Sequence, residues 1–159
     1  MQLHAIPFEP QHVFFVDYVF AQNIDVLHGN PVSHEEWNHC LCVDPDHHEK
    51  NFMITADGEL AAWLKLNGLN KPDICISMLV VADEYKRKGI GIFAVQFAEN
   101  YAREHNKASV AIQTTQDNTA ATNCYFKQGY LIEKKIRYAV GDGVTRDGYQ
   151  FHKVLEVNR

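Results

Sequence analysis

Residues 74–101 constrain the fold of this chain more than any other stretch. They begin with an apolar run at 74–82 that is rich in branched residues and too short for a stable isolated helix, as is typical of a buried strand. A basic loop follows, in which Lys86, Arg87 and Lys88 precede Gly-Ile-Gly, and apolar residues then recur at helical spacing. The sequence therefore predicts a strand, a basic glycine loop and an amphipathic helix in direct succession.

This order of elements is suited to binding an anion. Glycines let the backbone approach a ligand closely, and the first N–H groups of a helix point out of its N-terminus together with the positive end of the helix dipole. Gly89 and Gly91 fit neither the P-loop pattern nor the dinucleotide fingerprint. The loop is interpreted either as a phosphate or pyrophosphate site or as a basic solvated turn ahead of an ordinary surface helix.

A second strand and helix follow. Residues 109–114 form another apolar strand pattern, Asn118 is a favourable N-cap, and Gly129 is a favourable stop after a helix of about ten residues. The strand-helix-strand-helix order is typical of an α/β arrangement.

Together these segments resemble the GNAT superfamily of acetyl-CoA-dependent N-acetyltransferases. The first motif of that family, Arg/Gln-x-x-Gly-x-Gly/Ala after a strand, stands here as Lys86-x-x-Gly89-x-Gly91, with lysine in place of arginine or glutamine. The second stands here as Asn118, Ala121, Tyr125 and Gly129-Tyr130. The resemblance is close over residues 74–152. In the rest of the chain it extends only to the order of strands and helices.

The resemblance implies an α/β (α+β) fold with a mixed, mostly antiparallel central sheet flanked by helices, and with a V-shaped opening between the central strands. It also implies transfer of an acetyl group from acetyl-CoA to a primary amine, by direct attack in a ternary complex and without a metal. Homodimers are common among similar proteins, and a homodimer stays an open alternative to a monomer.

The resemblance also assigns roles to individual residues. Tyr125 would protonate the departing thiolate, since a phenol with a pKa near 10 holds its proton at neutral pH. Main-chain groups of Leu79 and Val81 would hold the pantetheine arm and polarise the thioester carbonyl. Asn118 would act as an N-cap, alone or with an added contact to that arm. The pyrophosphate would lie on the loop formed by Lys86, Arg87, Lys88, Gly89, Ile90 and Gly91.

The acceptor and the general base stay open. Residues 114–121 look somewhat like those of members that acetylate amino-sugars or nucleotide-linked amino-sugars, and a peptide N-terminus, a polyamine or an aminoglycoside fits nearly as well. Similar enzymes often place a glutamate near the central strand, where this chain has none, which leaves His34, Glu36, His39 and Asp73 as alternatives for the base.

Two other functions are weighed against the acetyltransferase. One is a non-catalytic module of the same fold that senses acyl-CoA, against which Tyr125 argues. The other is a hydrolase with Cys124 as nucleophile and His105 or His152 as base, although the family attacks directly from the substrate amine, so that Cys124 is expected to serve packing.

Length and charge indicate the number of domains and argue against some other classes of protein. The 159 residues suit a single domain, 1–159, with its own core, and a net charge of −5 with a pI near 6.0 argues against a general nucleic-acid-binding surface. No apolar window is long enough to span a membrane, and the N-terminus does not look like a signal peptide. We therefore expect a cytoplasmic protein with reduced cysteines, a small-molecule amine as partner, and no nucleic-acid or membrane partner.

The remaining segments of the chain are expected to form strands and helices but contain no further sequence motif. Strands are expected at 2–6, 51–55, 60–66, 131–140 and 149–157, with a turn at Asp57-Gly58 and a glycine-rich loop at 141–148. Helices are expected from Glu9 or Pro10 to about His28 and, after a capping box that starts at Ser33, over 35–42. The acidic and histidine residues at 44–48, near Cys40 and Cys42, lack the two spaced ligand pairs of a zinc site.

Overall fold

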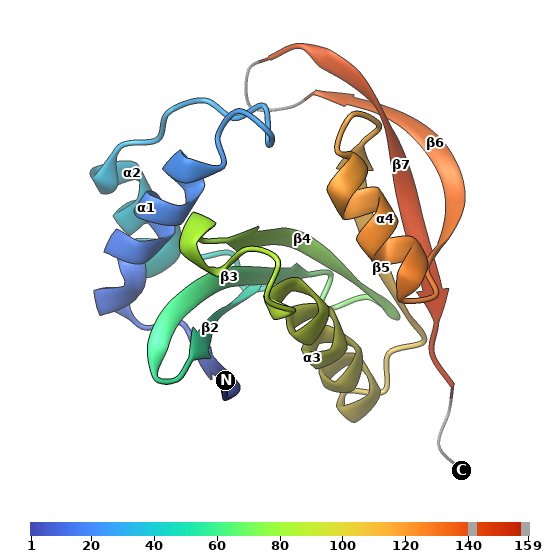
Figure 1. Cartoon of the computed structure of the whole chain (residues 1–159), viewed down its shortest axis with the longest axis horizontal. Coiled ribbons are helices and arrows are strands. Elements are labelled where there is room, and N and C mark those ends of the chain that lie inside the picture. Colours follow the sequence, from blue (N-terminus) through green and yellow to red (C-terminus); the bar gives the residue numbers. More distant parts are fainter. Residues whose placement is uncertain (140–142, 157–159) are drawn as a thin grey trace.

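The computed structural model describes residues 1–139 and 143–156, and a seven-stranded sheet forms its centre (Figure 1). The strand order is β1-β2-β3-β4-β5-β7-β6, and every neighbouring pair is antiparallel except β4 and β5. The sheet is therefore mixed and mostly antiparallel, as predicted. Its strands are β1 (Leu3–Pro7), β2 (Lys50–Ala56), β3 (Glu59–Asn67), β4 (Asp73–Val81), β5 (Ser109–Thr115), β6 (Leu131–Ala139) and β7 (Thr145–Val154).

Helices cover both faces of the sheet (Figure 1). The α-helices are α1 (Val13–Gln22), α2 (His34–Asn38), α3 (Ile90–Glu104) and α4 (Thr119–Lys127). Short 3₁₀ turns lie at Pro10–His12 and Asp83–Tyr85, and a π-helical turn at His39–Val43 continues α2. The α1 and α2 helices pack on one face of the sheet, and α3 and α4 pack on the other.

Two separate hydrophobic cores correspond to these two faces. On the α1 side, Val16 and Trp37 pack against Trp63 and Val80 of the sheet. On the α3 and α4 side, a larger core gathers apolar residues of the strands against the two motif helices. Strands that contribute side chains to both cores are buried on both faces, which explains why β3 and β4 read as nearly continuous apolar runs.

A β-bulge in β4 changes which face its side chains occupy. Lys65 pairs with Met78 and Leu66 with Ile76, so Ser77 is an extra residue opposite β3. Ile76 therefore belongs to the α3-side core, whereas Met78 packs on the α1 side. In a regular strand without a bulge, residues 76 and 78 would point to the same face.

The one parallel pair is short. The β4 and β5 strands pair from Asp73 with Ser109 to Ile76 with Ile112, and the residues beyond these pairs are not in register. The ends of the two strands, Ser77–Val81 and Gln113–Thr115, therefore diverge. This divergence corresponds to the V-shaped opening that the family resemblance implies between the central strands.

The first helix is shorter than predicted. We expected it to continue to about His28, but α1 ends at Gln22 and hydrogen-bonded turns follow. The Asn23 side-chain amide donates to the Val19 carbonyl at 2.8 Å, so a side chain competes with the backbone for the last carbonyls of the helix. The turns end at His28, which has a left-handed φ of 52°.

The prediction for the last hairpin was partly wrong. Strand β7 begins at Thr145, not at 149, because Gly148 pairs with both Thr115 of β5 and Ile136 of β6 and thereby continues the strand. It ends at Val154. Residues 140–142 and 157–159, which the predicted loop and strand ends include, lie outside the described residues.

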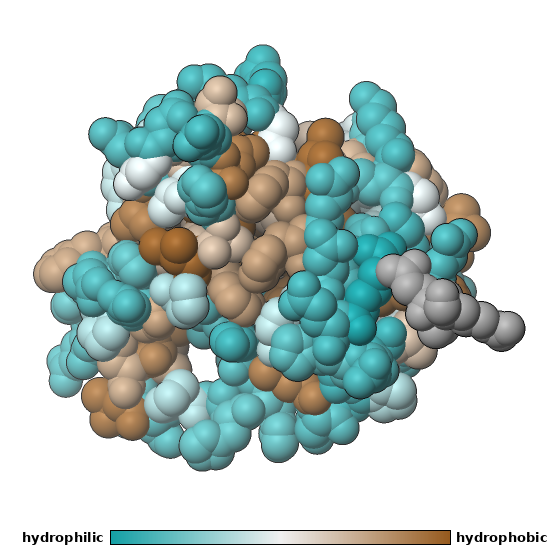
Figure 2. Space-filling view, turned by 90° about the horizontal axis from the view of Figure 1, so that it is seen from below, coloured by the Kyte–Doolittle hydropathy of each residue, from teal (hydrophilic) through white to brown (hydrophobic). Residues whose placement is uncertain are grey.

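On the face of the molecule shown in Figure 2, hydrophilic side chains predominate and apolar ones gather in a band near the middle. Such a mixture is ordinary for a protein surface. Among the described residues, no helix is long and apolar enough to cross a membrane.

Candidate active site

The predicted anion loop has the backbone geometry of an open cradle. Gly89 is the N-cap of α3 with a left-handed φ of 82°, and no side chain caps the helix. A Cβ built on Gly89 or Gly91 would meet no atom within 4 Å. Because the first N–H groups of a helix lack intrahelical partners, those of Ile90 and its neighbours are available to a bound anion. This loop has the shape and the partial positive charge that an anion needs.

The three basic residues of the loop differ in their contacts. The Lys86 ammonium lies 2.7 Å from Asp83 Oδ1, so part of its charge is already paired at the surface. Lys88 lies over the ring of Tyr85, with its Nζ 5.7 Å from the ring centroid. Arg87 is exposed and has a left-handed φ of 61°. In this loop, Lys86 and Lys88 therefore contact neighbouring side chains, whereas the guanidinium of Arg87 is exposed.

The second motif helix also forms as predicted. Asn118 caps α4, its Oδ1 accepting a hydrogen bond from the Ala121 N–H at 3.2 Å, and Gly129 adopts a φ of 88° after the helix. Tyr125 is 8% exposed and packs in the α3-side core against Tyr130 and Phe151. Burial, with smaller effects of the nearby Cys124 and Cys75 thiols, raises the pKa of its phenol well above the usual value, which keeps it protonated.

A cavity of about 590 Å³ occupies the α1 side of the gap between the diverging strands. One wall is apolar and comes from the end of α1, the loop after it and β4. The other wall carries amides and hydroxyls, mainly from β5 and the loop before α4. The lining residues are Phe20, Val26, Leu27, Gly29, Asn30, Val32, Asn67, Cys75, Ile76, Ser77, Met78, Gln113, Thr114, Thr115 and Asn118. Its size is that of a small-molecule site.

Gly29 lets the loop after α1 pack closely on the helix. A Cβ at this position would lie 2.7 Å from Cζ of Phe20, closer than non-bonded carbon atoms come. The Phe20 ring lines the cavity and packs edge-on against Trp37, at 5.1 Å between centroids. Gly29 therefore determines how closely the loop after α1 and the Phe20 ring pack together in the apolar wall of the cavity.

A polar contact joins the two sides of the cavity rim. His28 Nε2 lies 2.9 Å from Asp117 Oδ2, which links the loop after α1 to the loop before α4. The Thr115 hydroxyl also donates to Asp117 at 2.6 Å. The hydrogen bond from Thr115 and the contact with His28 lower the pKa of the Asp117 carboxyl, which is therefore ionised at neutral pH.

Several residues proposed from the sequence lie away from the cavity. His34 stacks on Phe14 at 4.4 Å, and Asp73 accepts a hydrogen bond from Ser109 at the other end of β4. Glu36 and His39 are exposed on α2 and the turn that continues it. In the described parts of the chain, therefore, none of the four alternatives for the base lines the cavity.

Among the described residues, no hydrogen bond joins Cys124 to His105 or His152. Its thiol accepts a hydrogen bond from the Gln128 amide at 3.2 Å, whereas His105 stacks on Tyr101 at the end of α3. His152 pairs with Ala111 and Leu131 in the sheet. These contacts are typical of packing residues, not of a nucleophile and its base.

The four cysteines are free, and Cys40 is exposed while the other three are partly buried. Burial raises the pKa of the Cys75 thiol to about 11, so this cavity-lining group stays neutral at physiological pH. Within residues 1–139 and 143–156, no three His, Cys, Asp or Glu side chains are grouped to hold a metal ion.

Sequence reasoning missed Asn23, which the structure places at a central position. It is 6% exposed, and its amide donates to the Val81 carbonyl at 3.1 Å as well as to Val19. The Val81 carbonyl is therefore already occupied in this structure. No local pattern distinguishes an asparagine at the end of a helix from an ordinary C-terminal cap, so this contact could not be read from the sequence.

The comparison with known families agrees with this geometry. The profile of the Acetyltransferase (GNAT) family matches residues 15–130, which includes most of α1, the anion loop, β5 and α4. The chain belongs to the GNAT acetyltransferase family. The coenzyme of this family is acetyl-CoA.

Solved structures of GNAT enzymes share the fold at low sequence identity. Spermidine N-acetyltransferase from Vibrio cholerae, in complex with CoA and spermine, superposes with a TM-score of 0.82 at 16% identity and covers 96% of this chain and 95% of its own. The ribosomal-protein-S18-alanine N-acetyltransferase from Escherichia coli gives 0.75 at 16% identity over 99% and 97%. Ard1 from Thermoplasma volcanium gives 0.78 at 16% over 98% and 99%. The comparison with curated protein sequences gives no match.

Proposed function

We propose that the protein transfers an acetyl group from acetyl-CoA to the primary amine of a small acceptor, by direct attack in a ternary complex. The observation that carries the proposal is the juxtaposition of two features. An open glycine cradle lies at the N-terminus of α3, and the strand that leads into it, β4, also borders the gap and the cavity. A ligand with a pyrophosphate at one end and a reactive group at the other could occupy both.

The coenzyme would bind along this path. Its pyrophosphate would lie on Lys86, Arg87, Lys88, Gly89, Ile90 and Gly91, chiefly on main-chain N–H groups. Leu79 and Val81 belong to the part of β4 beyond its pairing with β5, where main-chain groups have no strand partner on that side. These groups would hold the pantetheine arm, and Asn118, which lines the cavity, would contact the arm from the opposite side.

The chemistry would take place in the gap. The acceptor amine would attack the thioester carbonyl from the α1-side cavity, forming the C–N bond as the C–S bond breaks. Tyr125, on the α4 side, would give its phenolic proton to the departing thiolate, and its raised pKa means that it carries this proton at neutral pH. The amine proton would leave to solvent, because the four alternatives for the base lie elsewhere.

The cavity walls favour an acceptor with a neutral polar body, such as an amino-sugar. A sugar ring has an apolar face of C–H groups and a rim of hydroxyls, which matches an apolar wall opposite one that carries Gln113, Thr114 and Asn118. A polyamine would need carboxylates to pair its additional ammonium groups. Asp117 at the rim is already engaged with His28 and Thr115.

A second candidate is a non-catalytic acyl-CoA-sensing module. The observation that favours it is the position of the four alternatives for the base, none of which, in the described residues, reaches the cavity. The two candidates share coenzyme binding and differ in turnover.

Calorimetric titration with acetyl-CoA, NADH and ATP tests both candidates at once. Selective micromolar binding of acetyl-CoA is expected, followed by thiol release when glucosamine is added. Binding without thiol release from glucosamine, glucosamine 6-phosphate, spermidine or a peptide N-terminus would favour the sensing module. Absence of acetyl-CoA binding would overturn the proposed site on the loop and the function with it.

A further inference from the structure

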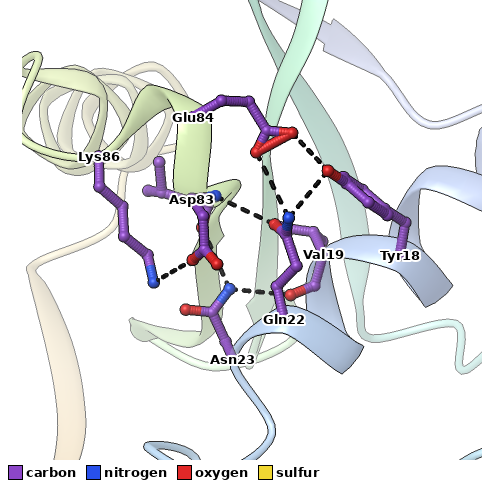
Figure 3. Close-up of polar contacts among 8 residues, drawn as sticks. Tyr18, Val19, Gln22, Asn23, Asp83, Glu84 and Lys86 are labelled. Carbon is purple, nitrogen blue, oxygen red and sulfur yellow. Dashed lines mark hydrogen bonds and ion pairs between the residues drawn. The ribbon is translucent and has the colours of Figure 1, made fainter.

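Three polar side chains at the end of α1 bind the connection between β4 and the anion loop. Figure 3 shows Tyr18, Gln22 and Asn23 reaching from the helix toward residues 81–86. Tyr18 and Gln22 are four residues apart and so lie on one helix face, and Asn23 directly follows the helix. We call these three residues the α1 clamp.

Each member of the clamp contacts a different residue of the connection. The Asn23 amide donates to the Val81 carbonyl at 3.1 Å, at the end of β4. Gln22 Oε1 accepts from the Asp83 N–H at 3.0 Å, and the Tyr18 hydroxyl donates to the Glu84 carboxylate. Gln22 Nε2 in turn donates to the Tyr18 oxygen at 2.8 Å, so the side chains also hold one another.

The contacts continue into the first residue of the anion loop. Asp83, whose main chain is held by Gln22, pairs through its carboxylate with Lys86 at 2.7 Å (Figure 3). A continuous chain of polar contacts therefore runs from α1 through Asp83 to Lys86. The same end of α1 carries Phe20 and leads into the loop that forms the apolar wall of the cavity.

We infer that Asn23 and Gln22 are positioning residues, which fix the end of β4 and the anion loop relative to the acceptor wall. Strand β4 needs such support because it has lost its β5 partner beyond Ile76. A strand end bonded on one side alone is free to shift, and sub-ångström placement of main-chain groups matters for a reacting carbonyl. The inference rests on the proposed function, since it gives these main-chain groups a ligand to hold.

Loss of Asn23 should affect kcat, whereas loss of Gln22 should affect the Kd of acetyl-CoA. Asn23 supports Val81, which lies near the proposed thioester position, so its loss should lower kcat while the pyrophosphate contacts persist. Gln22 supports Asp83 and through it Lys86, so its loss should weaken acetyl-CoA binding. A merely structural asparagine and glutamine would lower the melting temperature and leave both constants of the folded protein unchanged.

The test uses two near-isosteric variants with matched controls. Asn23→Leu and Gln22→Met remove the hydrogen bonds, while Asn100→Leu and Gln96→Met make the same changes on exposed positions of α3. Acetyl-CoA affinity is measured by calorimetry and turnover by thiol release, at a temperature where circular dichroism shows each variant folded. We expect Asn23→Leu to lower kcat about tenfold, the factor that corresponds to one hydrogen bond. We expect Gln22→Met to raise the acetyl-CoA Kd about threefold, since the Lys86 pair it supports is exposed.

Hydrogen exchange gives a readout that does not depend on turnover. In Gln22→Met the Asp83 amide loses its acceptor and should exchange faster than in wild-type protein or in Gln96→Met. Gln22→Met, a less buried site, also tests the clamp if Asn23→Leu does not fold. An active wild type whose folded clamp variants keep wild-type kcat and Kd would overturn the clamp alone. A wild type that neither binds acetyl-CoA nor releases thiol would overturn the proposed function and the clamp's role with it.

Discussion

Replacing Lys153 with methionine tests a buried charge network that anchors α4. Lys153 lies on β7, and its ammonium is 2.7 Å from Oε1 of Glu99 on α3 and 2.9 Å from the carbonyl of Gln128, directly after α4. The Glu99 side chain is 6% exposed and also accepts a bond from the Tyr130 hydroxyl at 3.3 Å. One lysine therefore joins β7, α3 and the end of the helix that carries Tyr125.

The expected loss of stability follows from what remains around the carboxylate. Breaking a buried ion pair by removing one partner typically costs about 3–5 kcal/mol, because a charge is left buried without compensation. Here Lys153 is 29% exposed, and Arg103 lies 4.0 Å from the same Glu99 oxygen and can replace part of the lost charge. We therefore expect Lys153→Met to lower the free energy of unfolding by about 2–3 kcal/mol. In a domain of this size that corresponds to a melting temperature lower by about 5–10 °C.

Urea denaturation followed by circular dichroism measures this change, with Lys127→Met, an exposed lysine of α4, as the matched control. The double variant Glu99→Leu/Lys153→Met removes both charges and should recover most of the loss. A Lys153→Met variant within about 0.5 kcal/mol of wild type would refute the argument. The argument would also be refuted if Glu99→Leu lowered the free energy of unfolding as much in the Lys153→Met background as an independent substitution would.

Four further outcomes follow from the site. Tyr125→Phe should lower kcat by about 10²-fold, the size of a general-acid contribution, and leave the acetyl-CoA Kd within twofold; unchanged thiol release would exclude Tyr125 as the acid. Gly89→Val should raise the acetyl-CoA Kd by about tenfold or more, because its φ of 82° disfavours a branched residue and its side chain would occupy the cradle. Equal affinity in calorimetry would mean that the pyrophosphate lies elsewhere. Gly29→Ala should raise the acceptor KM and spare acetyl-CoA binding, since its Cβ would displace the Phe20 ring from the cavity wall; the opposite pattern would contradict this placement. Burial raises the pKa of Cys75 from 9.0 to about 11, so its contribution to stability is full below pH 9 and lost as the pH rises toward 11; urea titrations should show this decline in wild type and a smaller one in Cys75→Ala, and parallel curves would refute it.

The motif region was predictable because its signals are local. Gly89 and Gly129 stand where the backbone needs a positive φ, and Asn118 where a helix needs an N-cap. Such requirements depend on only a few neighbouring residues, so they can be recognised in the local sequence. The placement of the anion loop and of Tyr125 on the second motif helix depended on these positions.

The parts that the sequence did not reveal depend on contacts between distant segments. Strand β7 continues through Gly148 because β5 and β6 lie on either side of it, which outweighs the turn preference of glycine. Asn23 ends α1 while binding Val81, 58 residues away. The alternatives for the base depend on such contacts as well: among the described residues, His34 stacks on Phe14 and Asp73 lies at the start of β4, and neither lines the cavity.

The bulge at Ser77 lets β4 carry one residue more than the facing part of β3 without moving the side chains on either side of it. Because Ile76 pairs with Leu66 and Met78 with Lys65, removal of Ser77 alone would close the bulge and leave Met78 and Val80 toward α1 and Leu79 and Val81 toward α3. Removal of Leu79 instead would bring Ser77 into the place of Met78 and send Met78 toward α3. Ser77 is therefore the position of this strand at which the loss of one residue should be tolerated best.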